Sequence, residues 1–400
     1  SQNPQIWRDY DPNWRQFIGT TLALVLDEYS ERLEADQIAR IDRAIRLAVE
    51  GEPAERCPAS YTNIALMKAA LLTWAGERYG EAGWVAYGET FGQAVYELFQ
   101  QTGAYDEYNS PTYYGVNLYA LAFWRRYARS QKLAAMGAAM EAALWRDIAR
   151  YYHPALANIC GPYTRSYGMD MPRYAALLGL SVWLGVGKEY APFPTEPGLF
   201  DHCHDFIFGA AFALIGTEIP ADALPHFTNF SGERTLRQPI TSAPERTATA
   251  WLSDNLMIGA ESTPLDEYAF FKPSDQFHPV TMHWRTPGGG IAWLRLRHIG
   301  PVDASAAPNR LTVAGTFEPS LAERFGDHHK EWVFEIFLPQ GSEGAQVTAG
   351  EWALPGLRVA VTTEVAEMLT GGDGSRLRLI YPVAEGQERV TFVLALTEKP

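Results

Sequence analysis

Apolar residues recur at helical spacing through the first half of the chain. Between about residues 14 and 216, apolar positions follow an i, i+3, i+4 pattern, and each run ends near Gly, Ser or Pro. Examples are DQIARIDRAIRLAVEG, NIALMKAALLTWAGERYG, WVAYGETFGQAVYELFQQTG, GVNLYALAFWRRYARS and AALLGLSVWLGVG. This half is therefore predicted to be helical.

The helical half also repeats. Trp74, Trp124 and Trp183 each lie inside an amphipathic run, at spacings of about 50 and about 60 residues. Such a period is typical of one helical hairpin per repeat, and stacked hairpins form an arc or a ring. We therefore predict an incomplete α/α toroid of about four hairpins.

The pattern changes at about residue 235. Short alternating or β-branched runs follow, separated by turn sequences such as TPGGG, LPQGSEG and TGGDGS. Strands at this spacing are typical of an antiparallel β-sandwich. Helices followed by strands predict an α+β chain with two domains, an α/α toroid at residues 1–225 and a β-sandwich at residues 226–400. The polar stretch HFTNFSGERTLRQPITSAPE, from His226, is the predicted linker.

Composition and net charge limit the classes of molecule that the protein is expected to bind. The 400-residue chain has a formal net charge of −14, which disfavours nucleic acid and anionic membranes, and it has no apolar run long enough to span a bilayer. Three cysteines without a CxxC pair allow at most one disulfide, with buried free thiols as the default. Aromatic residues make up 13%, which fits either a large core or a carbohydrate cleft. The chain begins SQNPQIW, and we expect a secreted or periplasmic protein.

Polar residues gather where the inner helices of the toroid should begin. The helices that carry the tryptophans are the more apolar, so we expect them to form the inner ring of the toroid. Their N-terminal ends should then face the same opening of the ring. The segments at these positions are CPASYTN, YDEYNSPTYYG, GPYTRSYGMD and FDHCHD. They hold a large share of the Tyr, Asn, Arg and His of this half.

Two of these segments suggest chemistry. In YDEYNSPTYYG, capping explains Asn109, Ser110 and Pro111 but not the tyrosines around them. In GPYTRSYGMD, glycines on both sides of Arg165 and Tyr167 predict a close backbone approach or an unusual loop path. Arg165 either pairs with an acidic neighbour, lowers the pKa of a tyrosine, or binds a carboxylate.

The histidines leave several roles open. His202 and His204 are two residues apart, which does not suit two metal ligands on one helical face. Structural, catalytic, sugar-binding and metal-binding roles remain possible, as they do for DHH (from Asp327) and FHPVTMH (from Phe277). The chain lacks GxSxG, HExxH, a P-loop and GxGxxG, which argues against α/β-hydrolase, zincin and nucleotide enzymes.

The segments NSPTYYG and YTRSYG, and more weakly HCHD, resemble those of α/α-toroid polysaccharide lyases, which include the heparinase II/III-like, chondroitin AC and alginate lyases. The resemblance implies a carbon–oxygen lyase that cleaves a uronate-containing polysaccharide or oligosaccharide by β-elimination, with no metal or cofactor. It implies Tyr167 as base and acid, Arg165 beside it, Asn109 as the group that neutralises the substrate carboxylate, and His204 as a second base or carboxylate partner. The substrate contacts implied are Tyr108, Tyr113, Tyr114, Asn63, Tyr163 and His202.

Two other functions stay open at this point. A glycoside hydrolase on a similar toroid would use paired carboxylates, for which the candidates are Asp106, Glu107, Asp170 and Asp205. A non-catalytic glycan-binding protein would need only aromatic platforms. The sequence leaves the glycan, the endo or exo mode and the oligomeric state open.

Overall fold

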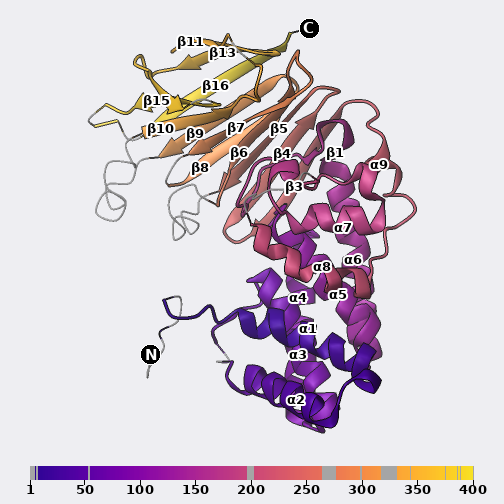
Figure 1. The fold of residues 1–400 in the computed structure, drawn as a ribbon. Helices are drawn as coiled ribbons and strands as arrows, with labels where there is room; N and C mark the ends of the chain where they lie inside the picture. The colour runs from indigo at the N-terminus through magenta and orange to yellow at the C-terminus, as the bar shows by residue number, and fades with distance from the viewer. Residues whose placement is uncertain are drawn as a thin grey trace. The chain divides into compact units, whose positions relative to one another are not determined.

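Helices come first along the chain and strands follow (Figure 1). The computed structural model describes residues 5, 8–52, 55–195, 202–263, 276–297, 300–316, 331–342, 344–373, 375–384, 386–387 and 389–399. Within these ranges every strand pairing is antiparallel. The predicted fold class, helical hairpins followed by an antiparallel β-domain, is confirmed.

The helices match the amphipathic runs of the sequence. The α-helices are α1 (Trp14–Tyr29), α2 (Ala35–Glu50), α3 (Thr62–Tyr79), α4 (Ala82–Thr102), α5 (Tyr113–Tyr127), α6 (Gln131–Tyr151), α7 (Leu177–Gly185), α8 (Gly209–Ile215) and α9 (Pro225–Thr228). Short 3-10 helices are η1 (Ser30–Arg32), η2 (Pro154–Leu156), η3 (Met171–Arg173), η4 (Lys188–Tyr190) and η5 (Cys203–Phe208). Among the helices described, none is long and apolar enough to cross a membrane.

The strands are short, as the turn sequences predict. They are β1 (Tyr152–His153), β2 (Asn158–Ile159), β3 (Arg234–Ser242), β4 (Glu245–Leu252), β5 (Leu256–Thr263), β6 (Val280–Arg285), β7 (Ile291–Arg297), β8 (Val302–Ala307), β9 (Arg310–Thr316), β10 (Glu331–Phe337), β11 (Gln346–Thr348), β12 (Glu351–Leu354), β13 (Leu357–Thr363), β14 (Leu369–Asp373), β15 (Arg376–Pro382) and β16 (Arg389–Glu398). The predicted linker from His226 instead contains the end of α9 and all of β3. It has a linker-like composition because β3 pairs on one side only, with β4, and presents exposed polar side chains.

The chain forms two compact units, each assembled from separate segments. The first comprises Ser1–Glu107, Tyr114–Leu144 and Phe206–Glu218. The second comprises Tyr108–Tyr113, Trp145–Asp205 and Ile219–Pro400, so it joins part of the helical half to the strands. The division into domains at residues 225 and 226 follows the chain order of helices and strands, and it stays a prediction.

Successive helical hairpins build the first unit. The Trp74 indole of α3 donates a hydrogen bond to Asp27 of α1 (2.7 Å). In the next hairpin the Trp124 indole of α5 donates to the carbonyl of Leu66 in α3 (2.9 Å). Trp74 and Trp124 therefore each bind their helix to the preceding hairpin. Trp183 lies in α7 of the second unit and is partly exposed.

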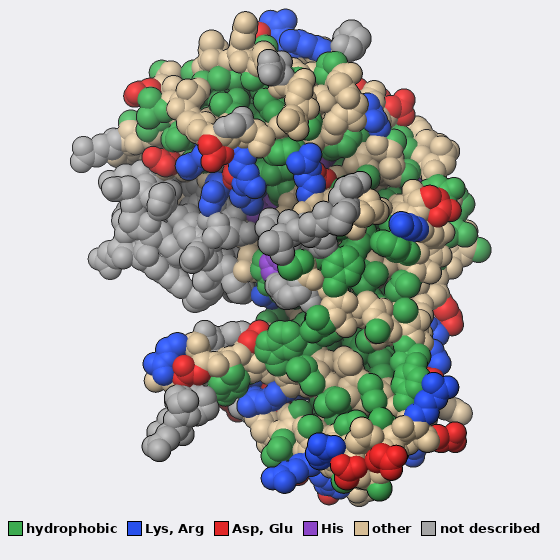
Figure 2. All heavy atoms as spheres, in the orientation of Figure 1, with side chains coloured by type: hydrophobic (Ala, Val, Ile, Leu, Met, Phe, Trp, Pro, Cys, Tyr) green, Lys and Arg blue, Asp and Glu red, His purple; other side chains and the backbone are tan. Residues whose placement is uncertain are grey.

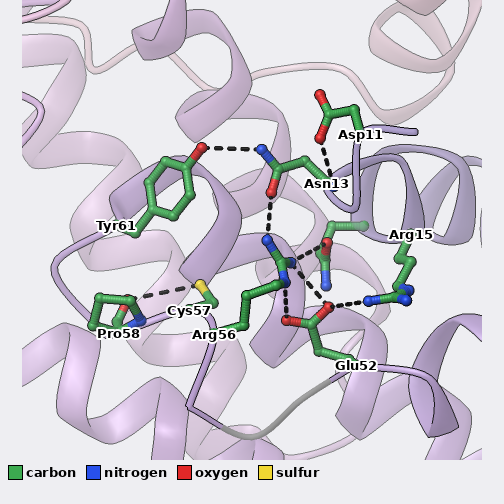
Figure 3. A network of polar contacts seen from close by, with 9 residues as sticks. Asp11, Asn13, Arg15, Glu52, Arg56, Cys57, Pro58 and Tyr61 are labelled. Carbon is green, nitrogen blue, oxygen red and sulfur yellow. Dashed lines mark hydrogen bonds and ion pairs between the residues drawn. The ribbon is translucent and has the colours of Figure 1, made fainter. Parts of the chain in front are cut away.

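A partly buried arginine, Arg56, fastens the start of α1 to the segment before α3 (Figure 3). The Arg56 guanidinium donates to both carboxylate oxygens of Glu52, at 2.8 and 2.9 Å, and to the side-chain oxygens of Asn13 (2.8 Å) and Gln16 (3.3 Å). Asn13 in turn donates to the hydroxyl of Tyr61 (3.0 Å). Charge-assisted, nearly water-free bonds of this kind are among the stronger ones in proteins, so they stabilise a segment that has no helix of its own.

The second unit contains a β-sandwich formed by one folded sheet. Strand β5 pairs along one edge with β4, and along the other first with β6 and then with β8, so the sheet folds over at β5. The two layers meet in an apolar core. There the ring of Phe334 in β10 lies 5.2 Å from that of Phe392 in β16, and the Trp352 indole of β12 bonds to the Tyr381 hydroxyl of β15 (3.0 Å). These strands are distant in the sheet order, so their contacts are face to face, and the sandwich is confirmed.

Candidate active site

The loop between β2 and η3, residues 160–170, lies against strand β6 within the second unit. The amide of Tyr163 donates to the carbonyl of His278 (3.0 Å), and the amide of His278 donates back to Tyr163 (2.9 Å). The amide of Ser166 donates to the carbonyl of Gln276 (2.7 Å). Three main-chain bonds therefore fix the loop that carries Arg165 and Tyr167.

Two glycines permit this close approach. A Cβ atom on Gly161 would lie 2.1 Å from the Thr281 hydroxyl oxygen on β6, and one on Gly168 would lie 2.5 Å from the ring of Tyr174. No side chain fits at either separation, because ordinary van der Waals contacts of a Cβ atom begin near 3.4 Å. The close approach predicted from the flanking glycines is confirmed.

Two buried histidines, His278 and His283, hold the same loop through hydrogen bonds to its main-chain carbonyls. The Nε2 atom of His278 lies 3.2 Å from the carbonyl oxygen of Ser166, and that of His283 lies 2.5 Å from the carbonyl oxygen of Met169. Carbonyls only accept, so Nε2 carries the hydrogen in both rings. Burial lowers the pKa of His283 to about 4 and that of His278 well below its ordinary value, so both rings are neutral at neutral pH.

The segment before α5 is fastened to the loop from the other side. Asn109 has a left-handed backbone (φ 51°), and its amide donates to the carbonyls of Cys160 (2.6 Å) and Pro162 (2.9 Å). The Ser110 hydroxyl donates to the carbonyl of Arg165 and accepts from the amide of Tyr113 at the first turn of α5 (3.0 Å). Capping and loop anchoring are therefore performed by the same hydroxyl.

These contacts bring two tyrosines together. The hydroxyl oxygens of Tyr113 and Tyr167 are 2.6 Å apart, a short hydrogen bond in which either can donate. The Arg165 guanidinium carbon lies 4.3 Å from the centre of the Tyr113 ring, and its Nε donates to the side-chain oxygen of Gln276 (2.9 Å). The His202 ring stacks on Tyr167 at 3.8 Å and 20°. A hydroxyl pair, a guanidinium and an imidazole thus occupy one small region.

A cavity of about 690 Å³ opens beside this group. Its walls include Tyr167 and His202 on one side and Trp293, Arg295 and Arg376 of the sheet on the other. Volumes of this size accommodate ligands of one to a few sugar rings. Figure 2 shows Lys and Arg side chains gathered on the surface that the strands form, although the chain as a whole is acidic.

Asp170 is the acidic member of the cavity wall among the residues described. Its carboxylate accepts from the Asn158 amide (3.3 Å) and pairs with Arg173 (3.0 Å). Burial raises the pKa of Asp170 above its ordinary value, against the lowering effects of Asn158 and Arg173. The wall therefore carries more arginine than carboxylate.

The predicted site residues fall into three groups. Tyr113, Arg165, Tyr167 and His202 lie together at or beside the cavity. Tyr108, Asn109 and Tyr163 have fully buried side chains and frame the loop: Tyr108 accepts from Thr164 through its carbonyl, and the Tyr163 hydroxyl donates to Ile159. Asn63 and Tyr114 belong to the first unit, where Asn63 donates to Glu107 (2.5 Å) and the Tyr114 ring lies 6.4 Å from that of Tyr105. The side chain of His204 and the DHH segment lie outside the described residues.

Sequence reasoning missed the sheet side of the cavity. Arg295 and Arg297 alternate with Leu294 and Leu296, so the sequence of β7 resembles a strand with one solvent-facing side, whereas Trp293 and Arg295 are in fact buried. The one usable signal was the pair of arginines at alternate positions in WLRLR, which places two charges on one face of a strand.

Metal-ligating side chains do not cluster in the described part of the chain: no group of three or more His, Cys, Asp or Glu could hold an ion there. The cysteines Cys57, Cys160 and Cys203 are free. Burial raises the pKa of Cys57 to about 12 and that of Cys160 well above its ordinary value, so both thiols stay protonated. The expectation of free thiols is confirmed.

Comparisons with known proteins give families without an assigned function. Residues 1–217 match the family described as "Domain of unknown function (DUF8769)", and residues 232–372 match "Domain of unknown function (DUF8770)". None of the curated proteins matches the chain. Among solved structures, a crystal structure of heparinase III is similar over 99% of this chain and 71% of that chain, at 10% identity and a TM-score of 0.42. The first match spans more than half of the sequence, and the chain belongs to the family of unknown function DUF8769.

Proposed function

We propose that the protein is a polysaccharide lyase that cleaves a uronate-containing glycan by β-elimination. The observation that carries the proposal is the hydroxyl pair of Tyr113 and Tyr167 beside Arg165 and His202, next to a cavity with an arginine-rich wall. A tyrosine that exchanges a proton with a bound sugar needs a hydrogen-bonded partner and a nearby positive charge. Tyr113 is the hydrogen-bonded partner of Tyr167, and the Arg165 guanidinium lies over the ring of that partner.

The chemistry requires one proton to move from carbon to oxygen. In its ionised form, which accepts a hydrogen bond from Tyr113, the Tyr167 oxygen takes the proton from C5 of the uronate, the electrons of that bond form the C4–C5 double bond, and the C4–O4 bond breaks. The proton then passes to O4 of the departing sugar, so the tyrosine returns to its starting state. Negative charge that develops on the carboxylate during this step must be stabilised by a preorganised donor.

His202 and Arg165 are the groups we assign to that stabilisation. His202 lines the cavity and stacks on Tyr167, and Arg165 is held against Tyr113 by its bond to Gln276. The predicted role of Asn109 changes, because both hydrogens of its amide are donated to main-chain carbonyls. We assign Asn109 to positioning the loop. His204 keeps its proposed role as a second base or carboxylate partner. A glycan substrate also fits the proposed secreted or periplasmic location.

A glycoside hydrolase is the second candidate, favoured by Asp170. A buried carboxyl with a raised pKa in a cavity wall has the properties of a general acid. That mechanism also needs a second carboxylate about 5 to 10 Å away. Asp205 is the described candidate for it, since its carboxylate lies 3.9 Å from Nδ1 of the cavity-lining His202. The tyrosine pair supports the lyase better, because the cavity wall itself holds Tyr167 and more arginine than carboxylate.

The test is product chemistry combined with four variants. Uronate oligosaccharides are incubated with the protein, and the conjugated C4–C5 double bond is followed by ultraviolet absorbance, since hydrolysis does not create it. Tyr167→Phe should lower turnover by about 10² to 10⁴ while binding persists. Tyr114→Phe, which alters the first unit, is the matched control and should keep turnover.

The outcomes separate the two candidates. If Tyr113→Phe abolishes turnover and Tyr167→Phe does not, the proton moves through the other member of the pair. The lyase proposal is wrong and the hydrolase takes its place if the unsubstituted protein gives saturated products, Tyr167→Phe and Tyr113→Phe stay active, and Asp170→Asn is inactive.

A further inference from the structure

Three arginines and two aromatic rings form the part of the cavity wall that lies away from Tyr167. Trp293 of β7, Phe337 of β10 and Arg376 of β15 occupy one row across the sheet, since Phe337 pairs in register with both of the others. The Trp293 and Phe337 rings stack at 5.6 Å and 18°. The guanidinium carbons of Arg295 and Arg376 lie 5.7 and 5.6 Å from the centre of the Trp293 ring.

A single buried glutamate, Glu335, holds Arg295 and Arg376 in place without cancelling their combined charge. Glu335 accepts from Arg295 (2.8 Å) and from Arg376 (2.9 Å), and Arg297 lies 3.6 Å away. Burial alone would raise the pKa of Glu335, but the three guanidiniums lower it below its ordinary value, so the carboxylate is ionised. Among the described residues, Arg173, Arg295 and Arg376 of the wall face two carboxylates, Glu335 and the Asp170 that pairs with Arg173 (3.0 Å), so an excess positive charge remains at the wall. A ligand can reach this positive charge best at Arg376, because the Arg376 side chain is half exposed.

The same wall also borders a second hollow. A neighbouring cavity of about 830 Å³ shares Arg173, Phe337 and Arg376 with the first. The Arg173 guanidinium carbon lies 4.5 Å from the Phe337 ring, so Arg173 and Arg376 flank this ring at the boundary of the two hollows. A group bound by these arginines is therefore placed between the space beside Tyr167 and the next space along the sheet.

We infer that Arg173, Arg295 and Arg376 form a subsite for a second negatively charged group, a carboxylate or a sulfate, on the sugar next to the one that is cleaved. The inference rests on the proposed function for the identity of the ligand as an acidic glycan. Planar guanidiniums bind carboxylate and sulfate oxygens through paired donors, and an aromatic floor packs against the apolar face of a sugar ring. The shared chemistry is a tetrahedral or planar oxyanion attached to a hexose.

The experiment measures binding separately from turnover. Isothermal titration calorimetry is performed in a Tyr167→Phe background with three probes. Two are tetrasaccharides of alternating uronate and N-acetylhexosamine, one without sulfate and one O-sulfated on the hexosamine. The third is an unsulfated disaccharide with a single uronate, which has one anionic group only. Each probe is titrated into Arg376→Gln, Arg173→Gln and a control, Arg358→Gln, which removes a half-exposed arginine paired with Glu351 elsewhere in the same unit.

Arg376→Gln should weaken the binding of a tetrasaccharide about tenfold or more, because a charge-assisted hydrogen bond is lost. Arg173→Gln should weaken it in the same direction. The disaccharide should bind with unchanged affinity, and Arg358→Gln should have no effect on any probe. A loss confined to the sulfated tetrasaccharide identifies the anion as sulfate, whereas a loss for both identifies a carboxylate.

The inference is overturned if neither tetrasaccharide binds, or if Arg376→Gln and Arg173→Gln bind both tetrasaccharides as tightly as Arg358→Gln does. It is also overturned if the disaccharide is weakened as much as the tetrasaccharides, since the arginines would then hold the reacting uronate itself. Anion-dependent binding without any elimination by the unsubstituted protein would leave the subsite standing and refute the lyase proposal.

Discussion

Acid should destabilise the second unit through the histidines beneath the Arg165–Tyr167 loop. His283 is fully buried, and its Nε2–H donates to the carbonyl of Met169. Burial lowers its pKa from 6.5 to about 4, so the unfolded chain takes up a proton on this ring at a higher pH than the folded chain does. The free energy of unfolding should therefore be fully available above about pH 6.5 and fall as the pH decreases towards about 4.

The magnitude follows from that difference. One pKa unit corresponds to about 1.36 kcal/mol, so a drop from 6.5 to about 4 corresponds to roughly 3 kcal/mol for His283 alone. His283→Gln removes the titration and keeps an amide hydrogen that can reach Met169. The variant should be about 1 kcal/mol less stable at neutral pH through imperfect packing, but it should lose roughly 3 kcal/mol less on acidification.

Urea unfolding followed by tryptophan fluorescence, at about pH 7 and about pH 4, measures both quantities. Other groups titrate in the same range, but they contribute equally to both proteins and cancel in the difference. His226→Gln is the control for a histidine outside the loop support. Burial also lowers the pKa of His226, but this ring is partly exposed, so its replacement should change the acid loss less than His283→Gln does. If His283→Gln and the unsubstituted protein lose the same stability on acidification, His283 is not the responsible group and our account of the loop support fails.

Three further predictions concern single positions. Gly161→Ala should reduce the free energy of unfolding by about 3 kcal/mol, measured by urea unfolding, because its Cβ would lie 2.1 Å from Thr281; full stability would show that the loop and β6 can separate at no cost. Arg56→Lys should lower the free energy of unfolding by about 2 kcal/mol, because one ammonium cannot replace the paired donors of the guanidinium. An unchanged thermal midpoint would show that the network of Figure 3 does not stabilise the protein. Gln276→Leu should lower kcat/KM on a uronate glycan about tenfold by releasing Arg165, and Gln276→Asn, which keeps an amide oxygen as acceptor, should lower it less; equal rates for both variants would exclude this positioning role.

The sequence was sufficient where local pattern and local structure coincide. The helical runs became helices because their apolar stripes have a hairpin partner, as in α3 and α4. The glycines around Arg165 correctly indicated a close approach, since glycine at such a position reports sterics directly. The partner in that approach, Thr281, was not predictable, because it lies 120 residues further along the chain.

The rest of the site depends on tertiary contacts that leave weak local signals. Gln276 holds Arg165 across 111 residues. Arg295 and Arg376 look like surface residues of their strands and become a cavity wall only when β7, β10 and β15 align. The strand β3 was mistaken for a linker, because a polar strand paired on one side has the composition of a loop.

The contact between Gly161 and Thr281 has a consequence for inheritance. The two residues lie in segments that match different families, residues 1–217 and 232–372, yet they pack within one compact unit. Neither segment holds a complete cavity, since Tyr167 comes from the first and Arg295 from the second. A gene that recombined the first segment of one homologue with the second segment of another would have to match both sides of this contact at once. We therefore expect the two segments to be transmitted together and to change in a correlated way, although each has the length of an independent domain.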